Sequence, residues 1–150
     1  MPIHLCRLRP GDERLLDQVA ADVFDEPVRA DRLAAYLATP GHLMVLAIDG
    51  DLVVGQCAGV IHAHPDKVTE LYVDEVGTAT SHLRQGIATA MLAELFAWGR
   101  ELGCEEAWLG TELDNAAANG LYRAFGGKAE TMQYYEFDLR AEATTAPKRS

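Results

Sequence analysis

The feature that most restricts the possible fold is a pair of strand-forming apolar runs around one Asp-Gly dipeptide. The sequence LMVLAIDGDLVVGQCAGVI occupies residues 43–61, with Asp49 and Gly50 between the two runs. Asp-Gly flanked by such runs is a strong signal for a tight turn, so this stretch predicts a β-hairpin. A proline-containing turn at residues 64–66 and the strand-forming sequence KVTELYV at residues 67–73 follow directly. We therefore expect the middle of the chain to consist of successive strands.

Helical patterns and further strand-forming runs lie on both sides of this hairpin. Apolar residues recur at helical spacing from Leu15 to Val23. A second helix is expected to begin near Pro27, which suits a first helical turn, and to stop before Thr39. After the hairpin, helical spacing continues until Gly103, a typical helix stop. In chain order we expect strand 3–8, two helices, the hairpin, strand 67–73, helix 86–103, strand 105–112, helix 115–126 and strand 132–139. This order predicts an α/β (α+β) fold, with a mixed central sheet flanked by helices.

Length, composition and charge restrict the class of protein. A chain of 150 residues with 49% hydrophobic residues is typical of one globular domain, which we expect to span residues 1–139 and to be followed by a flexible tail at 140–150. The 23 acidic against 13 basic residues argue against nucleic-acid binding and favour either a cationic substrate or plain solubility. No run reaches the roughly 18 apolar residues of a membrane span, and the N-terminus lacks a signal-peptide core. We expect no membrane partner and a cytoplasmic location.

The cysteines and histidines give no sign of a disulfide or metal site. Cys6, Cys57 and Cys104 are odd in number, widely spaced and without a C-x-x-C pair. We expect them to be reduced core residues, which also favours a reducing cytoplasm. His62 and His64 alternate and can share a face, but no third ligand is evident near them in the sequence, so we expect no metal site.

The segment RQGIAT at residues 84–89 opens the long apolar helix. The first N–H groups of a helix lack partners within the helix, and the helix dipole attracts anions to them. Gly86 and Ala88 leave these groups uncovered, and Arg84 adds a charged donor. The segment contains neither the G-x-G-x-x-G nor the Walker G-K-[ST] pattern. From these residues alone, it is either an ordinary helix start or a cradle for phosphate groups.

Two motifs together resemble the GNAT acetyltransferase superfamily. They are R-Q-G-I-A-T-A-x-L, which begins at Arg84, and N-x-x-A-x-x-L-Y, which ends at Tyr122. The resemblance extends over roughly residues 3–139. Leu83 departs from the family, which usually carries Gln or Arg there, and the loop at residues 73–82 looks a residue or two long. The resemblance implies that the pyrophosphate of acetyl-coenzyme A is held by Arg84, Gln85, Gly86, Ile87, Ala88 and Thr89.

The resemblance also implies roles for residues of the second motif and of the strand before the cradle. Asn115 and Ala118 would contact the cofactor near its pantetheine and pyrophosphate. Tyr122, two helical turns beyond Asn115, would lie near the sulfur and protonate the departing thiolate. Glu70 would accept the proton of the acceptor amine, directly or through water. A core tyrosine and a solvated acid are the plain alternatives for Tyr122 and Glu70.

Alternation along the strand at residues 67–73 places Glu70 and Tyr72 on the face opposite Leu71 and Val73. By resemblance, this strand splays from its neighbour, and Leu71, Tyr72 and Val73 then line the cofactor. The exposed backbone N–H of Tyr72 or Val73 would stabilise the oxyanion that develops on the thioester carbonyl.

Over the whole chain the resemblance is greatest to the small aminoglycoside 3-N-acetyltransferases, through ADVFDEP, LATPGHLMVLAIDGDLVVGQCAGV and the ending MQYYEFDL. A polycationic aminosugar needs several carboxylates around its amines. The resemblance implies that these are Asp25, Glu26, Glu70, Glu136 and Asp138, for which a solvated acidic surface is the alternative. Cys104 has no partnered histidine in the sequence, so direct attack in a ternary complex is expected rather than an acetyl-cysteine route.

The function implied is therefore acetyl-CoA-dependent N-acetylation of an aminoglycoside antibiotic, at its 3-amino group, with resistance as the consequence. A homodimer is compatible with it. Two alternatives stay open. One is the same fold acting on another amine, such as a polyamine or a peptide, because one fold hosts many acceptors. The other is an acyl-CoA-binding module without turnover.

Overall fold

The computed structural model describes residues 2–140 and residue 147. They belong to two compact units, Met1–Glu112 and Leu113–Ser150, and each unit is described by itself. The tail expected at residues 140–150 lies outside the described residues, apart from Arg140 and Pro147.

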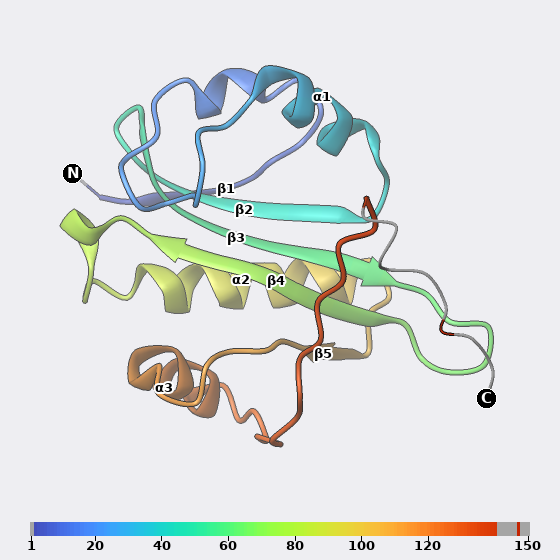
Figure 1. Cartoon of the computed structure of the whole chain (residues 1–150). Helices are drawn as coiled ribbons and strands as arrows, with labels where there is room; N and C mark the ends of the chain where they lie inside the picture. The colour runs from blue at the N-terminus through green and yellow to red at the C-terminus, as the bar shows by residue number, and fades with distance from the viewer. Residues whose placement is uncertain (1, 141–146, 148–150) are drawn as a thin grey trace. The chain divides into compact units, whose positions relative to one another are not determined.

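The first unit is built on a five-stranded sheet with strand order β1-β2-β3-β4-β5 (Figure 1). Its first four strands are antiparallel, and the last is parallel to its neighbour. This is the mixed sheet that the sequence predicts. The strands are β1 His4–Arg7, β2 His42–Asp49, β3 Leu52–His62, β4 Glu70–Thr78 and β5 Glu106–Trp108.

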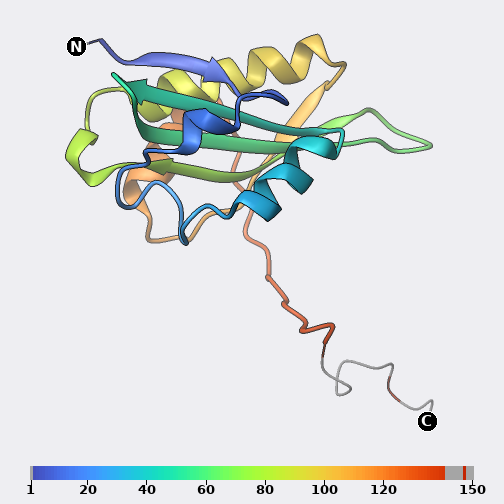
Figure 2. The ribbon, with the colours of Figure 1, turned by 90° about the horizontal axis from the view of Figure 1, so that it is seen from above.

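Helices cover both faces of this sheet. The short 3-10 helix η1 (Glu13–Leu16) and α1 (Ala30–Ala38) precede the hairpin, while the 3-10 helix η2 (Thr80–His82) and α2 (Ile87–Glu101) follow β4. Figure 2 shows α1 and α2 on opposite faces of the sheet. The second unit contains α3 (Ala116–Ala124), within the range predicted for it.

The core lies between α2 and the sheet. Met91, Leu92 and Leu95 of α2 are fully buried, together with Leu46 of β2 and Leu71 of β4. Burial of one such side chain contributes about 1.5–3 kcal/mol relative to exposure. The helical spacing of these residues is the signal from which α2 is predicted, and its bounds match the prediction closely.

The predicted hairpin forms, with β2 and β3 paired in antiparallel register from His42 and Val60 to Asp49 and Leu52. Gly50 has φ +65°, the left-handed conformation that a tight hairpin turn requires and that glycine adopts without a steric penalty.

The helix predicted over residues 15–23 is wrong beyond its first turn. Only η1 is helical, and the chain then runs along the beginning of β3, where Val53 N–H donates to Gln18 O and Ala20 N–H donates to Val53 O, both at 2.9 Å. These backbone bonds to β3 replace the intrahelical bonds, while Val23 remains buried. The next helix begins at Ala30 rather than near Pro27, because Arg29 is still extended at ψ 133°.

The strand after residues 64–66 is longer than predicted and contains a bulge. β4 extends through the first part of the segment predicted as a long loop and ends at Thr78. Gly59 pairs with Val73, whereas Ala58 pairs with Glu75, so Asp74 is the extra residue. A bulge shifts the alternation of side chains by one, which a period-two pattern does not predict.

Two other strands differ from prediction. β5 ends at Trp108 instead of continuing to residue 112. Residues 132–139 form no strand in the described part of the chain, and Tyr134 and Phe137 are well exposed. Their alternating pattern suits a strand, but a strand also requires a hydrogen-bonded partner, and the pattern does not supply one.

Cys57 and Cys104 are buried, as expected of core residues, whereas Cys6 is only partly buried. Cys6, Cys57 and Cys104 are free thiols, and partial or full burial raises the pKa of each, that of Cys57 to about 12 with a contribution from the charge of Asp74. In the part of the chain that the structure describes, no helix has the length and apolar character needed to cross a membrane.

Candidate active site

The centre of the candidate site is the point where β5 separates from β4. The two strands pair only from Glu70 and Glu106 to Tyr72 and Trp108, whereas β4 continues to Thr78. The rings of Tyr72 and Trp108 contact each other at this last pair, with centroids 4.3 Å apart. Beyond it, the backbone of β4 has no strand partner on the β5 side among the described residues. The early end of this pairing is compatible with the expected splay of the strand, which stays a prediction.

Glu70 lies at the start of β4 and faces away from the core. Its neighbour Leu71 is buried, packed towards Gly99 of α2, so alternation turns Glu70 and Tyr72 to the other face of the sheet. The Glu70 side chain is 18% exposed. It is therefore within reach of solvent molecules and partly shielded from them.

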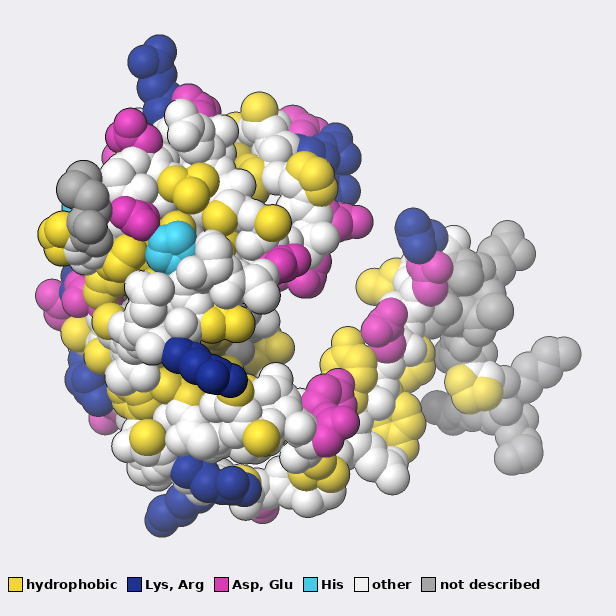
Figure 3. All heavy atoms as spheres, turned by 90° about the vertical axis from the view of Figure 1, so that its left-hand side faces the viewer, with side chains coloured by type: hydrophobic (Ala, Val, Ile, Leu, Met, Phe, Trp, Pro, Cys, Tyr) yellow, Lys and Arg dark blue, Asp and Glu magenta, His cyan; other side chains and the backbone are white. Residues whose placement is uncertain are grey.

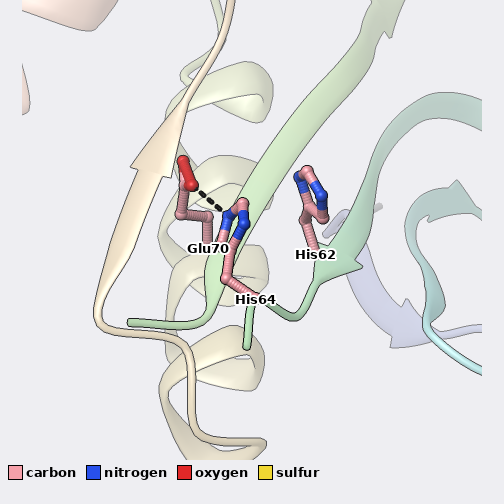
Figure 4. Close-up of side chains that lie close together, drawn as sticks. All are labelled: His62, His64 and Glu70. Carbon is pink, nitrogen blue, oxygen red and sulfur yellow. Dashed lines mark hydrogen bonds and ion pairs between the residues drawn. The ribbon is translucent and has the colours of Figure 1, made fainter. Parts of the chain in front are cut away.

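The Glu70 carboxylate is held by a histidine. His64 Nε2 lies 2.5 Å from Glu70 Oε1, and the histidine side chain is 13% exposed (Figure 4). Such a charge-assisted hydrogen bond fixes the carboxylate and provides a path for a proton between oxygen and nitrogen. Sequence reasoning did not assign this role to His64. The available signal was its place in the turn that leads directly into the strand of Glu70.

Two residues in left-handed backbone conformation shape the segment before α2. Arg84 has φ +62° and Gly86 has φ +74°. For a residue with a side chain, this conformation costs about 1–2 kcal/mol, so the strain at Arg84 marks a constrained turn. Alternation of left-handed with other conformations turns successive N–H groups towards one concave space, the anion-binding arrangement called a nest.

The first amides of α2 are available to a ligand. The first backbone bond of the helix is donated by Ala90 N–H to Gly86 O, so the amides of Ile87, Ala88 and Thr89 have no acceptor within the helix. Apart from its two chain neighbours, a Cβ added at Gly86 would meet nothing within 4 Å, so the surface at the residue that precedes these amides is open. Figure 3 views the side where α2 begins, and the basic side chains visible there do not form one continuous patch. An anion here would therefore rely mainly on backbone amides and on the exposed Arg84 and Gln85 side chains, with the exposed Leu83 beside them.

An acidic cavity, largely open to solvent, lies on the face of the sheet that carries Glu70, the face on which Gln56 contacts Val23. It has a volume of about 560 Å³ and is lined by Phe24, Asp25, Glu26 and Glu75. The structure thus brings two predicted acids, Asp25 and Glu26, together with Glu75, an acid that the sequence analysis did not identify. Glu75 reaches this face only because of the bulge at Asp74. Without it, alternation would place Glu75 with Val73 on the core side.

The carboxylates at this cavity influence one another. Loss of contact with water raises the pKa of Glu75, and the charges of Asp74 and Asp25 raise it further, while a hydrogen bond from Gln56 Nε2 at 3.0 Å acts in the opposite direction. Desolvation likewise raises the pKa of Asp74. Clustered carboxylates that lose hydration are stabilised by a cation, so the cavity suits a positively charged ligand.

The remaining predicted residues belong to the second unit. Asn115 precedes α3, and its Oδ1 accepts a hydrogen bond from Ala118 N–H at 3.1 Å, as an N-cap does. Tyr122 is half-buried two turns further along α3. Glu136 and Asp138 lie in the extended segment, where Arg140 donates to Asp138 at 3.0 Å and lowers the pKa of that carboxyl.

Comparison with known proteins identifies the family. The model of the acetyltransferase (GNAT) family matches residues 12–126. No sequence among the curated proteins matches this chain. Several solved structures have the same fold at low sequence identity.

An aminoglycoside acetyltransferase from an uncultured soil metagenomic sample has a TM-score of 0.77 at 21% identity, covering 93% of this chain and 99% of that one. A second one, also from a soil metagenome and bound to sisomicin, has a TM-score of 0.77 at 16% identity, covering 91% and 96%. The enzyme AAC(6')-Iy, in complex with a bisubstrate analogue of coenzyme A and acetylneamine, has a TM-score of 0.73 at 16% identity, covering 93% and 100%. With its five-stranded mixed sheet, the early end of the pairing between β4 and β5, and the family match over residues 12–126, the chain belongs to the GNAT acetyltransferase family.

Proposed function

We propose that this protein transfers the acetyl group of acetyl-CoA to an amino group of a cationic aminoglycoside, by direct attack of the amine in a ternary complex. The observation that carries the proposal is the Glu70–His64 pair beside the end of the pairing between β4 and β5, on the same sheet face as an acidic cavity. The aminoglycoside acetyltransferases among the similar structures support this class of acceptor.

The chain's own groups suit the cofactor. The open space above Gly86 and the uncommitted amides of Ile87, Ala88 and Thr89 fit a pyrophosphate, with Arg84 and Gln85 beside them. When bound, acetyl-CoA supplies an acetyl group activated as a thioester. The backbone N–H of Tyr72, at the last pair between β4 and β5, or of Val73, just beyond it, would donate to the carbonyl oxygen as charge develops on it.

Glu70 is the proposed base. Aliphatic amines are mostly protonated at neutral pH, so a carboxylate must remove a proton before or during attack. His64 holds the carboxylate in place and can share the proton through the contact at 2.5 Å. For Tyr122 we retain the acid role that the family resemblance implies, namely protonation of the departing thiolate.

The acceptor's other amines are proposed to bind at the acidic cavity, through Asp25, Glu26 and Glu75. Charge attraction into a cavity of one sign raises the local concentration of a cation and favours substrates with several amines. Glu136 and Asp138 stay candidates from the resemblance alone. A cytoplasmic location, which the free thiols support, and a role in antibiotic resistance complete the proposal.

The deciding experiment is an acceptor panel with acetyl-CoA, in which release of free thiol is measured for a gentamicin-type aminoglycoside, spermidine and a peptide with a free N-terminus. We expect turnover mainly on the aminoglycoside, and NMR of the product would distinguish the 3-amino from the 6'-amino group. Turnover on the peptide alone would refute the proposed acceptor. Binding of acetyl-CoA without acetylation of any amine would instead indicate a module without turnover.

A further inference from the structure

Three metal-ligating side chains converge where β3 ends and β4 begins. His62 is the last residue of β3 and the direct register partner of Glu70, the first residue of β4. Side chains at such cross-strand positions stand next to each other on one face. His64, two residues after His62, turns back so that its ring lies between the other two groups (Figure 4).

The donor atoms are close enough for one ion to bind all three. One ligand atom from each of His62, His64 and Glu70 lies within 4.8 Å of the others, and the two imidazole rings have centroids 4.1 Å apart. Donors around a tetrahedral zinc ion, at bond lengths of about 2.0–2.2 Å, stand roughly 3.3–3.6 Å apart. To reach this spacing, the 2.5 Å contact between His64 and Glu70 must open and the longest separation, of up to 4.8 Å, must shorten, each by about 1 Å. His62 is exposed and free to adjust, whereas the largely buried His64 already lies against Glu70 and has to move only far enough to admit the ion.

Two imidazole nitrogens and one carboxylate oxygen are a donor set that borderline divalent ions prefer. Zinc in three-ligand sites uses this combination and leaves a fourth position to solvent, which the exposed side of His62 would provide here. The structure also supplies the third ligand that the sequence did not reveal, because Glu70 is six residues from His64 along the chain but in contact with it in space.

We propose that a zinc-class divalent ion binds to His62, His64 and Glu70, and that the bound ion blocks acetyl transfer. The ion would insert between His64 Nε2 and Glu70 Oε1 in place of their hydrogen bond. The metal would then engage the lone pairs of His64 Nε2 and Glu70 Oε1, and its positive charge would make the remaining oxygen of the Glu70 carboxylate a weaker proton acceptor. The proposal that the ion binds rests on the donor geometry alone, whereas the proposal that it inhibits acetyl transfer rests on the proposed function of Glu70 as base.

The binding test uses the full chain without a histidine tag and zinc chloride as the probe, followed by calorimetry in a buffer that does not chelate. We expect one ion per chain, and a loss of affinity of about tenfold or more in each of His62→Ala, His64→Ala and Glu70→Gln, because each removes one of three ligands. His4→Ala, an exposed histidine on β1, is the matched control and should bind like the parent. Cobalt(II) as a second probe should give absorption in the visible range that the same variants lose.

The inhibition test measures acetyl transfer against zinc concentration. Zinc should inhibit the parent, and His62→Ala should raise the concentration for half-inhibition about tenfold, relative to its own activity without zinc. Equal zinc affinity in the parent and in the three ligand variants, or no binding by the parent, would overturn the site. Binding without inhibition would overturn the block. If zinc binds as expected but no amine is acetylated, the metal site stands and the proposed function fails.

Discussion

The strain at Arg84 leads to a prediction in which stability and cofactor binding change in opposite directions. Arg84 has a left-handed backbone, φ +62°, and an exposed side chain. Arg84→Gly removes about 1–2 kcal/mol of conformational strain. It also increases the entropy of the unfolded chain, which costs about 0.4–1 kcal/mol. The net expectation is a gain of about 0.5–1 kcal/mol in the free energy of unfolding, or roughly 1–4 °C in Tm for a chain of this size.

The same substitution removes the guanidinium from the proposed phosphate cradle. An exposed charged contact of this kind contributes about 0.5–1 kcal/mol, so we expect a two- to fivefold rise in the KM for acetyl-CoA. Arg84→Ala is the matched control, because it removes the same guanidinium and keeps the strained Cβ. It should show the same change in KM with a stability within about 0.5 kcal/mol of the parent.

Urea unfolding followed by fluorescence, together with steady-state kinetics, measures both quantities. If Arg84→Gly is less stable than Arg84→Ala, the backbone at this position is not strained, and the inference of a constrained cradle fails. If neither variant changes the KM, the guanidinium does not contact the phosphates, and the backbone amides must bind them alone.

Gly86→Ala is the opposite substitution, because it adds a Cβ to a left-handed backbone instead of removing one. At φ +74° an added Cβ introduces the strain that Arg84 already carries, while nothing apart from its two chain neighbours lies within 4 Å of it. We expect a loss of about 0.5–1 kcal/mol in the free energy of unfolding, without the larger loss that a steric clash would cause. The methyl group would occupy the space above the amides and raise the KM for acetyl-CoA. An unchanged KM would show that this space does not hold the cofactor.

Three further substitutions test the proposed chemistry. Glu70→Gln retains the size of the side chain and removes the proton acceptor, so kcat should fall by about 10²–10⁴-fold, and an unchanged pH–rate profile would point to another base. Tyr122→Phe should lower kcat more than it raises the KM for acetyl-CoA, and a kcat close to that of the parent would remove Tyr122 from the acid role. Glu75 has a pKa raised above its ordinary 4.5 by desolvation and by neighbouring charges. The native state therefore holds this proton more tightly than the unfolded chain, and the resulting stabilisation, present below pH 4.5, is lost as the pH rises through the raised pKa. Glu75→Gln should accordingly increase stability at pH 7.5 but not at pH 4, and equal differences at the two pH values in urea unfolding would contradict this origin.

Local signals in the sequence predict the parts of the fold that depend on local interactions. The hairpin follows from Asp49-Gly50 and its flanking runs, and α2 follows from apolar spacing that ends before Gly103. Residues 17–23 were predicted incorrectly because their backbone bonds go to Val53 in β3, a partner far away in the sequence. Where a segment's hydrogen bonds are made by a distant strand, its own periodicity does not determine its structure.

The candidate site shows the same division. The proposed cradle is a local feature at the start of α2, and the local pattern predicts that Glu70 lies in a strand before it, whereas its role as base comes from the family resemblance and stays a prediction. The sequence does not predict the contact between Glu70 and His64, because that contact depends on how the turn before β4 folds back. It also does not predict Glu75 at the cavity, because Glu75 reaches that face through one bulged residue, Asp74. Helical or strand periodicity carries no information about either event.

The geometry of β4 also explains how a chain with net charge −10 can be suited to both a polyanionic cofactor and a polycationic acceptor. The carboxylates of Glu70 and Glu75 lie on one face of the sheet, whereas Leu71 and Val73 face α2, whose first amides form the proposed phosphate cradle on the opposite side. Attraction of the acceptor by carboxylates therefore does not require placing them against the phosphates, and backbone amides can bind the phosphates without a basic patch. In the first unit, the pairing of β4 with β5 ends after Tyr72, and we propose that the acetyl group and the amine meet at that opening. Glu70 lies two residues before this opening on the proposed acceptor side, and its contact with His64 distinguishes it from Asp74 and Glu75 as the proposed base.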